Sequence, residues 1–131
     1  MEDAIILVIA PNEDGRKFVD QLMYRKKDFA VLTNNRAEEQ QYLKMGVKNV
    51  VRIDTGMTKK WIVPQIAVDK IYIFESSLNL SCRYLQICRP WTSQEIYIVT
   101  RFWSPRGIYR GMGADHVVYT KNGDVGFLLE R

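Results

Sequence analysis

Runs of consecutive apolar residues alternate along this chain with segments in which apolar residues recur every three or four positions. The first run covers residues 4–10 (AIILVIA), and the turn residues PNEDG follow it at 11–15. A continuous apolar run with such a boundary is typical of a strand buried on both faces, as in a parallel sheet. From Arg16 onward the apolar residues have helical spacing. The opening therefore predicts a strand, a short loop and a helix, which is the first half of a βαβ unit.

The same alternation continues to the end of the chain. The pattern predicts strands at 4–10, 29–33, 48–53, 70–74, 95–100 and 115–119. It predicts helices at 15–26 and 36–45, a short or broken helix within 57–68, and helices at 76–90, 104–113 and 125–129. We therefore expect one α/β domain over residues 1–131, with a doubly wound, mostly parallel six-stranded sheet, helices on both faces and the first strand in a central position. This is a Rossmann-like arrangement.

Composition and charge restrict the partners. The chain has 131 residues, of which 47% are hydrophobic and 26% charged, and its net charge of +4 comes from scattered lysines and arginines. These are ordinary values for a globular domain, and the charge pattern does not favour nucleic-acid binding. No apolar run approaches the roughly 20 residues that span a bilayer. Glu2 and Asp3 also stand where a signal peptide would be basic, so we expect a cytoplasmic protein with no membrane insertion.

In a sheet of this kind, ligands bind beyond the carboxyl ends of the strands. The loop after the first strand would be the glycine-rich phosphate loop, but Gly15 is its only glycine, and Glu13 and Asp14 precede it. Gly15 fits either the last glycine of such a loop or an ordinary loop glycine. The two carboxylates would repel a pyrophosphate, whereas as first-turn acids they would complement the dipole of the helix.

The other candidate cofactor-binding residues follow the later strands. Besides Asn12 and Gly15 we select Asn34, Arg36, Asp54 and Ser76. Arg36 stands where a cation can bind the 2′-phosphate of NADP, and it is equally compatible with a solvated helix start. Asp54 could face an adenine or simply form a turn, and Ser76 could line the site or cap the next helix.

Catalytic and metal sites have little support. The single histidine, His116, has no partner suggested by spacing, and we expect it to pack or hydrogen-bond at a sheet edge. Glu75 is the best lone acid–base candidate, but the sequence supplies no partner for it. Cys82 and Cys88 would lie on different faces of one helix, so we expect two buried, reduced thiols.

Two segments carry a resemblance to a known family. They are Met112-Gly113-Ala114-Asp115-His116-Val117-Val118-Tyr119 and Met45-Gly46-Val47-Lys48-Asn49-Val50-Val51. With the six predicted strands, they make the chain similar to the TrkA-N or RCK domain of potassium-transport regulators. The resemblance implies a Rossmann-type domain that dimerises, binds NAD(H) or ATP and controls a channel or transporter.

The chain departs from that family at two places. Residues 10–15 (APNEDG) replace the glycine-rich loop, and residues 33–36 (TNNR) replace the segment with an acidic residue after the second strand. We therefore expect a regulatory or interaction module, linked to ion-transport regulation, with weak or lost binding of NAD(P) or another adenine nucleotide. The alternative is a small NADP-dependent oxidoreductase or an enzyme subunit.

An aromatic set in the last third of the chain suggests a protein interface. Its members are Trp91, Tyr97, Phe102, Trp103 and Tyr109, and three arginines lie among them. Trp, Tyr and Arg dominate interface hot spots, but the same residues could simply cover the sheet edge. By resemblance, we expect a homodimer that buries several of Trp91, Phe102, Trp103 and Tyr109, and a protein partner is also compatible with this composition.

Overall fold

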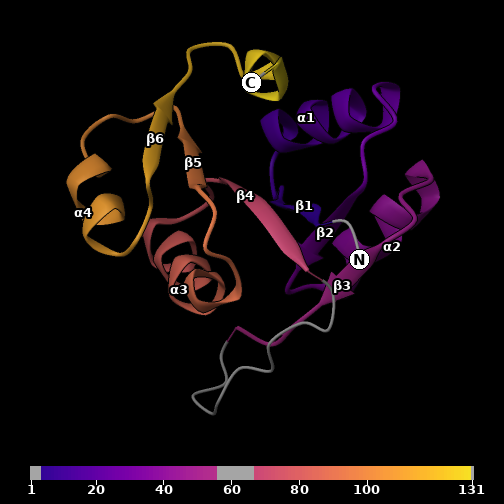
Figure 1. Ribbon diagram of the computed structural model, residues 1–131, viewed down its shortest axis with the longest axis horizontal. Coiled ribbons are helices and arrows are strands. Elements are labelled where there is room, and N and C mark those ends of the chain that lie inside the picture. The colour runs from indigo at the N-terminus through magenta and orange to yellow at the C-terminus, as the bar shows by residue number, and fades with distance from the viewer. Residues whose placement is uncertain (1–3, 56–66, 131) are drawn as a thin grey trace.

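The computed structural model describes residues 4–55 and 67–130 (Figure 1). Its strands are β1 (Ile5–Ile9), β2 (Phe29–Thr33), β3 (Val50–Arg52), β4 (Val68–Phe74), β5 (Ile96–Thr100) and β6 (His116–Tyr119). Its α-helices are α1 (Glu13–Tyr24), α2 (Arg36–Met45), α3 (Leu78–Cys88) and α4 (Arg106–Gly111), and its 3₁₀ helices are η1 (Arg89–Trp91) and η2 (Gly126–Glu130).

The six strands form one parallel sheet in the order β3-β2-β1-β4-β5-β6. β1 lies at its centre, where Leu7 is in register with Ala30 of β2 and Ile71 of β4. This confirms the predicted doubly wound sheet with the first strand in a central position. The strand order reverses between β1 and β4, which is where ligands bind in folds of this type.

Two apolar layers cover the two faces of the sheet. One contains Phe18, Val19 and Leu22 of α1, Tyr42 of α2, and Leu128 and Leu129 of η2. The other contains Leu85 and Ile87 of α3 and Tyr109 of α4. Figure 1 shows α1 and α2 on one side of the sheet and α3 and α4 on the other. The predicted helices on both faces are therefore present.

Some boundaries differ from the prediction. α1 begins at Glu13 rather than Gly15, because Asn12 caps it and draws the two acids into the first turn. β4 begins at Val68, within the segment predicted as a broken helix; the part of that prediction over 57–66 lies outside the described residues. Cys88 is buried and Cys82 is half-buried, and both thiols are free.

Gly15 lies against β1, and its lack of a side chain is required there. A Cβ atom added at Gly15 would come within 2.5 Å of Ala10 Cβ and 2.6 Å of Ala10 Cα. A backbone atom cannot move away as the end of a flexible side chain would. The absence of a side chain at Gly15 therefore allows the first turn of α1 to pack closely on Ala10 at the end of β1.

Gly15→Ala should lower the free energy of unfolding by about 2 kcal/mol or more, because α1 would have to move away from β1. Urea denaturation followed by circular dichroism measures this. The control is Gly107→Ala in α4, where nothing lies within 4 Å of the added Cβ. That change should be neutral or slightly stabilising. Equal effects of the two substitutions would contradict the packing role of Gly15.

Candidate functional site

The candidate site is a cavity of about 270 Å³ at the carboxyl ends of β1, β4 and β5. It lies at the point where the strand order reverses. Its lining residues are Asn12, Glu13, Asp14, Glu75, Val99, Thr100, Arg101 and Phe102. Of the cofactor-binding residues selected from the sequence, Asn12 is among these eight, and so is the acid–base candidate Glu75. How their side chains pair with one another follows from the fold.

Asn12 joins the first loop to the end of β4. The Gly15 N–H donates a hydrogen bond to Asn12 Oδ1 (2.8 Å), and Asn12 Nδ2 donates to the carbonyl oxygen of Glu75 (2.7 Å). The side chain thus caps α1 and occupies one of the backbone donors that a phosphate would use. Asn12 is at the predicted site, and both ends of its amide are bonded to the protein's own backbone.

Asp14 and Arg101 form a two-pronged ion pair beside the same helix end. Arg101 Nε donates to Asp14 Oδ2 and Arg101 Nη2 donates to Asp14 Oδ1, each at 2.7 Å. These bonds to Arg101 outweigh the effect of burial and hold the pKa of the Asp14 carboxyl below its usual value. Arg101 Nη1 also donates to the carbonyl oxygen of Lys121 (3.0 Å). Asp14 is a first-turn acid as predicted, and its pairing with Arg101 is an addition that only the fold supplies.

Glu75 acquires the partners that the sequence did not suggest. Thr100 Oγ1 donates to Glu75 Oε1 (2.6 Å), and the hydroxyl of Tyr109 donates to Glu75 Oε2. Burial, and then the bond to Glu75, raises the pKa of Tyr109 above its usual value. Both carboxylate oxygens of Glu75 therefore accept hydrogen bonds from hydroxyl groups of β5 and α4. These bonds hold the side chain in place in the lining of the cavity.

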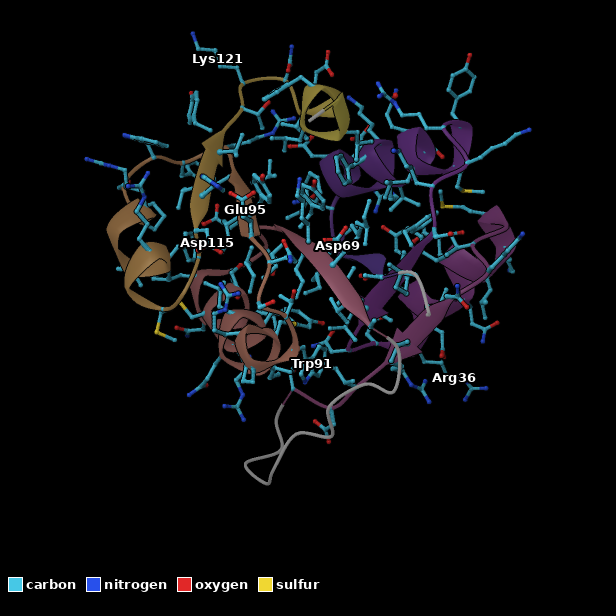
Figure 2. All side chains as sticks on the ribbon, viewed as in Figure 1. Arg36, Asp69, Trp91, Glu95, Asp115 and Lys121 are labelled. Carbon is cyan, nitrogen blue, oxygen red and sulfur yellow. The ribbon has the colours of Figure 1, made fainter. Side chains whose placement is uncertain are left out.

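The remaining selected residues lie near other strand ends. Asn34 Nδ2 donates to Thr55 Oγ1 (3.1 Å), and the carbonyl oxygen of Thr55 accepts from Arg83 Nε (2.8 Å). Arg36 is the first residue of α2 and is exposed at the periphery (Figure 2).

Two selected residues are exposed beyond β3 and β4. Asp54 is exposed after β3, and Ser76 is exposed after β4. Ser77, not Ser76, caps α3 by accepting from the Leu80 N–H (3.1 Å).

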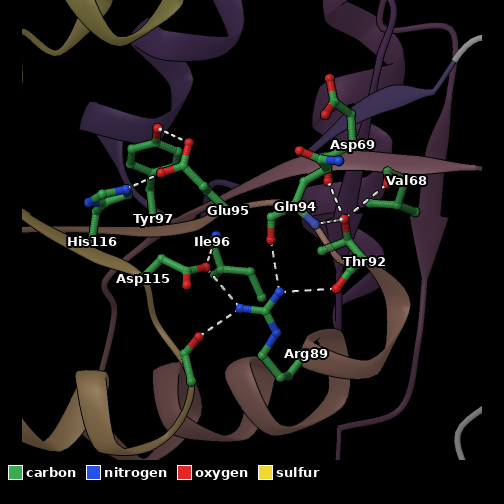
Figure 3. Close-up of polar contacts among 11 residues, drawn as sticks. Val68, Asp69, Arg89, Thr92, Gln94, Glu95, Ile96, Tyr97, Asp115 and His116 are labelled. Atoms are coloured by element: carbon green, nitrogen blue, oxygen red, sulfur yellow. Dashed lines mark hydrogen bonds and ion pairs between the residues drawn. The ribbon is translucent and has the colours of Figure 1, made fainter.

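The opposite edge of the sheet holds a second polar cluster, centred on Arg89 (Figure 3). Arg89 Nη1 donates to Gly113 O and Asp115 Oδ2, and Nη2 donates to Thr92 O and Gln94 O. Burial opposes ionisation of Asp115, but the Ile96 N–H and Arg89 outweigh it and lower the pKa of this carboxyl. Because Arg89 ties together the starts of β5 and β6, we interpret this cluster as structural.

His116 lies on the edge strand, as predicted. It stacks on Tyr97, with 4.8 Å between ring centroids, and its Nε2 contacts Glu95 Oε2. The bond to His116 lowers the pKa of Glu95. Among the described residues, no group of three or more His, Cys, Asp or Glu side chains could hold a metal ion.

The predicted aromatic surface does not form as one unit. Tyr109 is fully buried, because its ring packs between α4 and the sheet and its hydroxyl bonds Glu75. Its inclusion among interface residues was therefore wrong. Trp91 is partly buried against the apolar layer that contains α3. In Figure 2 it lies on the side of the molecule opposite Lys121, the second residue after the end of β6. Phe102 and Trp103 are exposed.

Comparison with solved structures identifies the fold. The TrkA-N domain of the Escherichia coli inner membrane protein ybaL superposes with a TM-score of 0.67 at 14% identity over 99% of this chain and 96% of that one. The NAD(P)-binding domain of an exopolyphosphatase-related protein from Archaeoglobus fulgidus gives a TM-score of 0.71 at 14% identity, over 98% and 96% of the two chains. The GsuK channel bound to NAD gives 0.68 at 20% identity, over 88% of this chain and 21% of that one.

The chain therefore has the fold of TrkA-N and RCK domains, as the resemblance implied. No family model matches the sequence, and no curated protein matches it. Among the helices of residues 4–55 and 67–130, none is long and apolar enough to cross a membrane.

Asp14→Asn should make the stability of the protein less dependent on pH. The lowered pKa of Asp14 means that its ionised form stabilises the fold above the unfolded-state pKa of roughly 4, and that this contribution is lost as the pH falls through the folded-state value. Urea denaturation at several pH values from 7 to 3 should show a difference between wild type and variant that is largest at neutral pH and shrinks in acid.

Asp20→Asn is the matched control, because Asp20 is an exposed acid on the same helix. It should leave the pH profile close to that of the wild type. A deficit of the Asp14 variant that is constant across the pH range would mean that the charge of Asp14 contributes nothing.

Proposed function

We propose that this chain is a regulatory or interaction module on a Rossmann scaffold, with weak or lost binding of NAD(P). The observation that carries this proposal is the occupation of the phosphate position by the protein's own side chains. Asn12 bonds the Gly15 N–H, and Asp14 and Arg101 pair beside it.

The energetics of that position oppose a dinucleotide. A pyrophosphate at the start of α1 would have to displace the Asn12 cap and approach the carboxylate of Glu13, beside the Asp14–Arg101 ion pair. A phosphate charge about 4 Å from a carboxylate meets a repulsion of about 1 to 4 kcal/mol, from water-like to surface-like surroundings. The nearest arginine cannot offset this without leaving Asp14. Each of these terms weakens binding relative to a glycine-rich loop.

The structural neighbours support the regulatory part of the proposal. One of them is a channel bound to NAD, and another is a domain of an inner membrane protein. A module of this fold with a self-occupied crevice could communicate with an ion-transport protein through its surface. Self-association is part of the proposal, because the related architecture is expected to dimerise.

The alternative function, a small NADP-dependent oxidoreductase or enzyme subunit, depends on Arg36. This side chain is exposed at the start of α2, next to Asn34 at the end of β2. Its position suits a 2′-phosphate. Glu75, the best acid–base candidate, has both carboxylate oxygens bonded to hydroxyl groups. The module is therefore the better supported function.

Titration calorimetry with NAD, NADH, NADP, NADPH and ATP should detect no tight binding to the full chain. We expect dissociation constants in the range of about 0.1 mM or weaker. A submicromolar constant for NAD would contradict the proposal. Binding of NADP that is tight and is lost in Arg36→Ala, but not in the matched α2 variant Lys44→Ala, would favour the oxidoreductase.

Sedimentation velocity over a range of concentrations tests the homodimer. The expected result is a concentration-dependent shift from about 15 to about 30 kDa, since two-fold pairing is the commonest assembly. A monomer at the highest concentration would contradict self-association without affecting the nucleotide result.

A further inference from the structure

Exposed apolar residues gather on one part of the surface, formed by α4, the loop before it and β6. Of the ten large hydrophobic residues that are exposed in the described parts of the chain, five lie between positions 102 and 119. They are Phe102 (68% exposed), Trp103 (44%), Ile108 (51%), Met112 (36%) and Tyr119 (46%). We call these five residues and α4 the α4 face. Such a cluster is typical of a protein interface.

Contacts within the α4 face hold it together. The rings of Trp103 and Tyr119 meet edge to face with 6.3 Å between centroids. The guanidinium of Arg106 lies 5.1 Å from the centre of the Trp103 ring, and Arg106 Nη1 donates to Trp103 O (3.0 Å). The loop before α4 and the end of β6 are thus joined by aromatic contacts, although these residues remain open to solvent.

The outermost positions of α4 are glycines that the fold does not require. With Tyr109 pointing inward and a rotation of 100° per residue, Gly107 and Gly111 face away from the sheet. A Cβ added at either position would have nothing within 4 Å. Glycine in a helix costs about 1 kcal/mol relative to alanine, and here no packing in the chain itself accounts for it. Close approach of another backbone to these two positions would account for the glycines.

The two flanks of this glycine stripe differ in chemistry. Ile108 and Met112 lie on one side, and Arg106 and Arg110 lie on the other. From Arg101 to Ala114 the sequence contains three arginines and no Asp, Glu or Lys. Arg101 is already paired with Asp14, so the positive charge of this face comes from the two α4 arginines.

This chemistry disfavours a second copy as the occupant. In a parallel two-fold pair of α4 helices, the apolar flank of each copy would face the arginine flank of the other. In an antiparallel pair the apolar flanks would face each other, but arginines would also face arginines, and like charges oppose association. An occupant that carries apolar residues beside acidic ones satisfies both flanks at once.

We propose that the α4 face docks an acidic amphipathic helix of another protein, with that helix crossing Gly107 and Gly111. Its apolar residues pack on Ile108, Met112 and Trp103, and its carboxylates meet Arg106 and Arg110. This inference rests on the proposed role as an interaction module and names its partner class. It does not depend on the state of the nucleotide crevice. It replaces the expectation that a homodimer buries Phe102 and Trp103, and a homodimer through another surface is compatible with it.

Selection from a library of displayed helical peptides of about 20 residues, with the full chain as bait, tests this proposal. Enriched peptides should place Asp or Glu beside an apolar stripe. Their affinity should fall by roughly tenfold or more in Arg110→Glu and in Gly107→Gln, which adds a side chain to the stripe at a position where a Cβ has nothing within 4 Å. Lys44→Glu, an exposed charge reversal on α2, is the control and should retain the affinity.

Three results would overturn the proposal. One is a selection that enriches peptides without acidic residues. Another is binders whose affinity is unaffected by both α4 substitutions, because these would bind elsewhere. The third is self-association that Trp103→Ala weakens in sedimentation, which would assign the face to a second copy. Tight NAD binding would contradict the proposed crevice and leave this inference intact.

Discussion

The close contact between α1 and β1 at Gly15 is the constraint on which the rest of this structure depends. Because Gly15 lies directly against Ala10, the start of α1 is fixed over the centre of the sheet. This places Asn12 within reach of the end of β4 and Asp14 within reach of the end of β5. Both polar links at the crevice follow from that one approach. A larger residue at position 15 would move the helix and break them together.

In the crevice, the protein's own side chains bond the backbone at the start of the first helix. The start of a helix attracts negative charge, and a glycine-rich loop leaves that attraction to a phosphate. In this chain an amide and a carboxylate of the protein occupy the same region, and Arg101 neutralises the carboxylate. The carboxylate of Asp14 lies in the first turn of α1, so the start of this helix has a negatively charged group from the chain itself. Arg101 also bonds Lys121, so the same pair links the crevice to the segment that leads to η2.

The Arg89 cluster and the α4 face differ in how far their side chains are bonded within the chain. At the starts of β5 and β6, Arg89 uses its donors on the chain itself, so that cluster is saturated. On the α4 face, the aromatic and apolar groups are exposed to water, and a Cβ added at Gly107 or Gly111 would have nothing within 4 Å. A residue that stabilises the fold, such as Arg89, is bonded to other residues of the chain. The residues of the α4 face have fewer contacts within the chain than Arg89 has, and for this reason the proposed interaction surface lies there.

The sequence by itself determined the six strands, their parallel arrangement and the central place of β1, because continuous apolar runs are buried on both faces and a helical pattern lies between successive runs. It also indicated that a site would lie beyond the carboxyl ends of the strands, since these ends lie together in a parallel sheet. Only the tertiary structure decided which polar groups meet there. Asp14 and Arg101 are separated by 87 residues, and Glu75 and Tyr109 by 34. Their pairing depends on which strands are neighbours and on how α4 is rotated. That rotation also buried Tyr109, which composition alone had grouped with the exposed aromatics, because composition carries no information about the direction in which a helix faces.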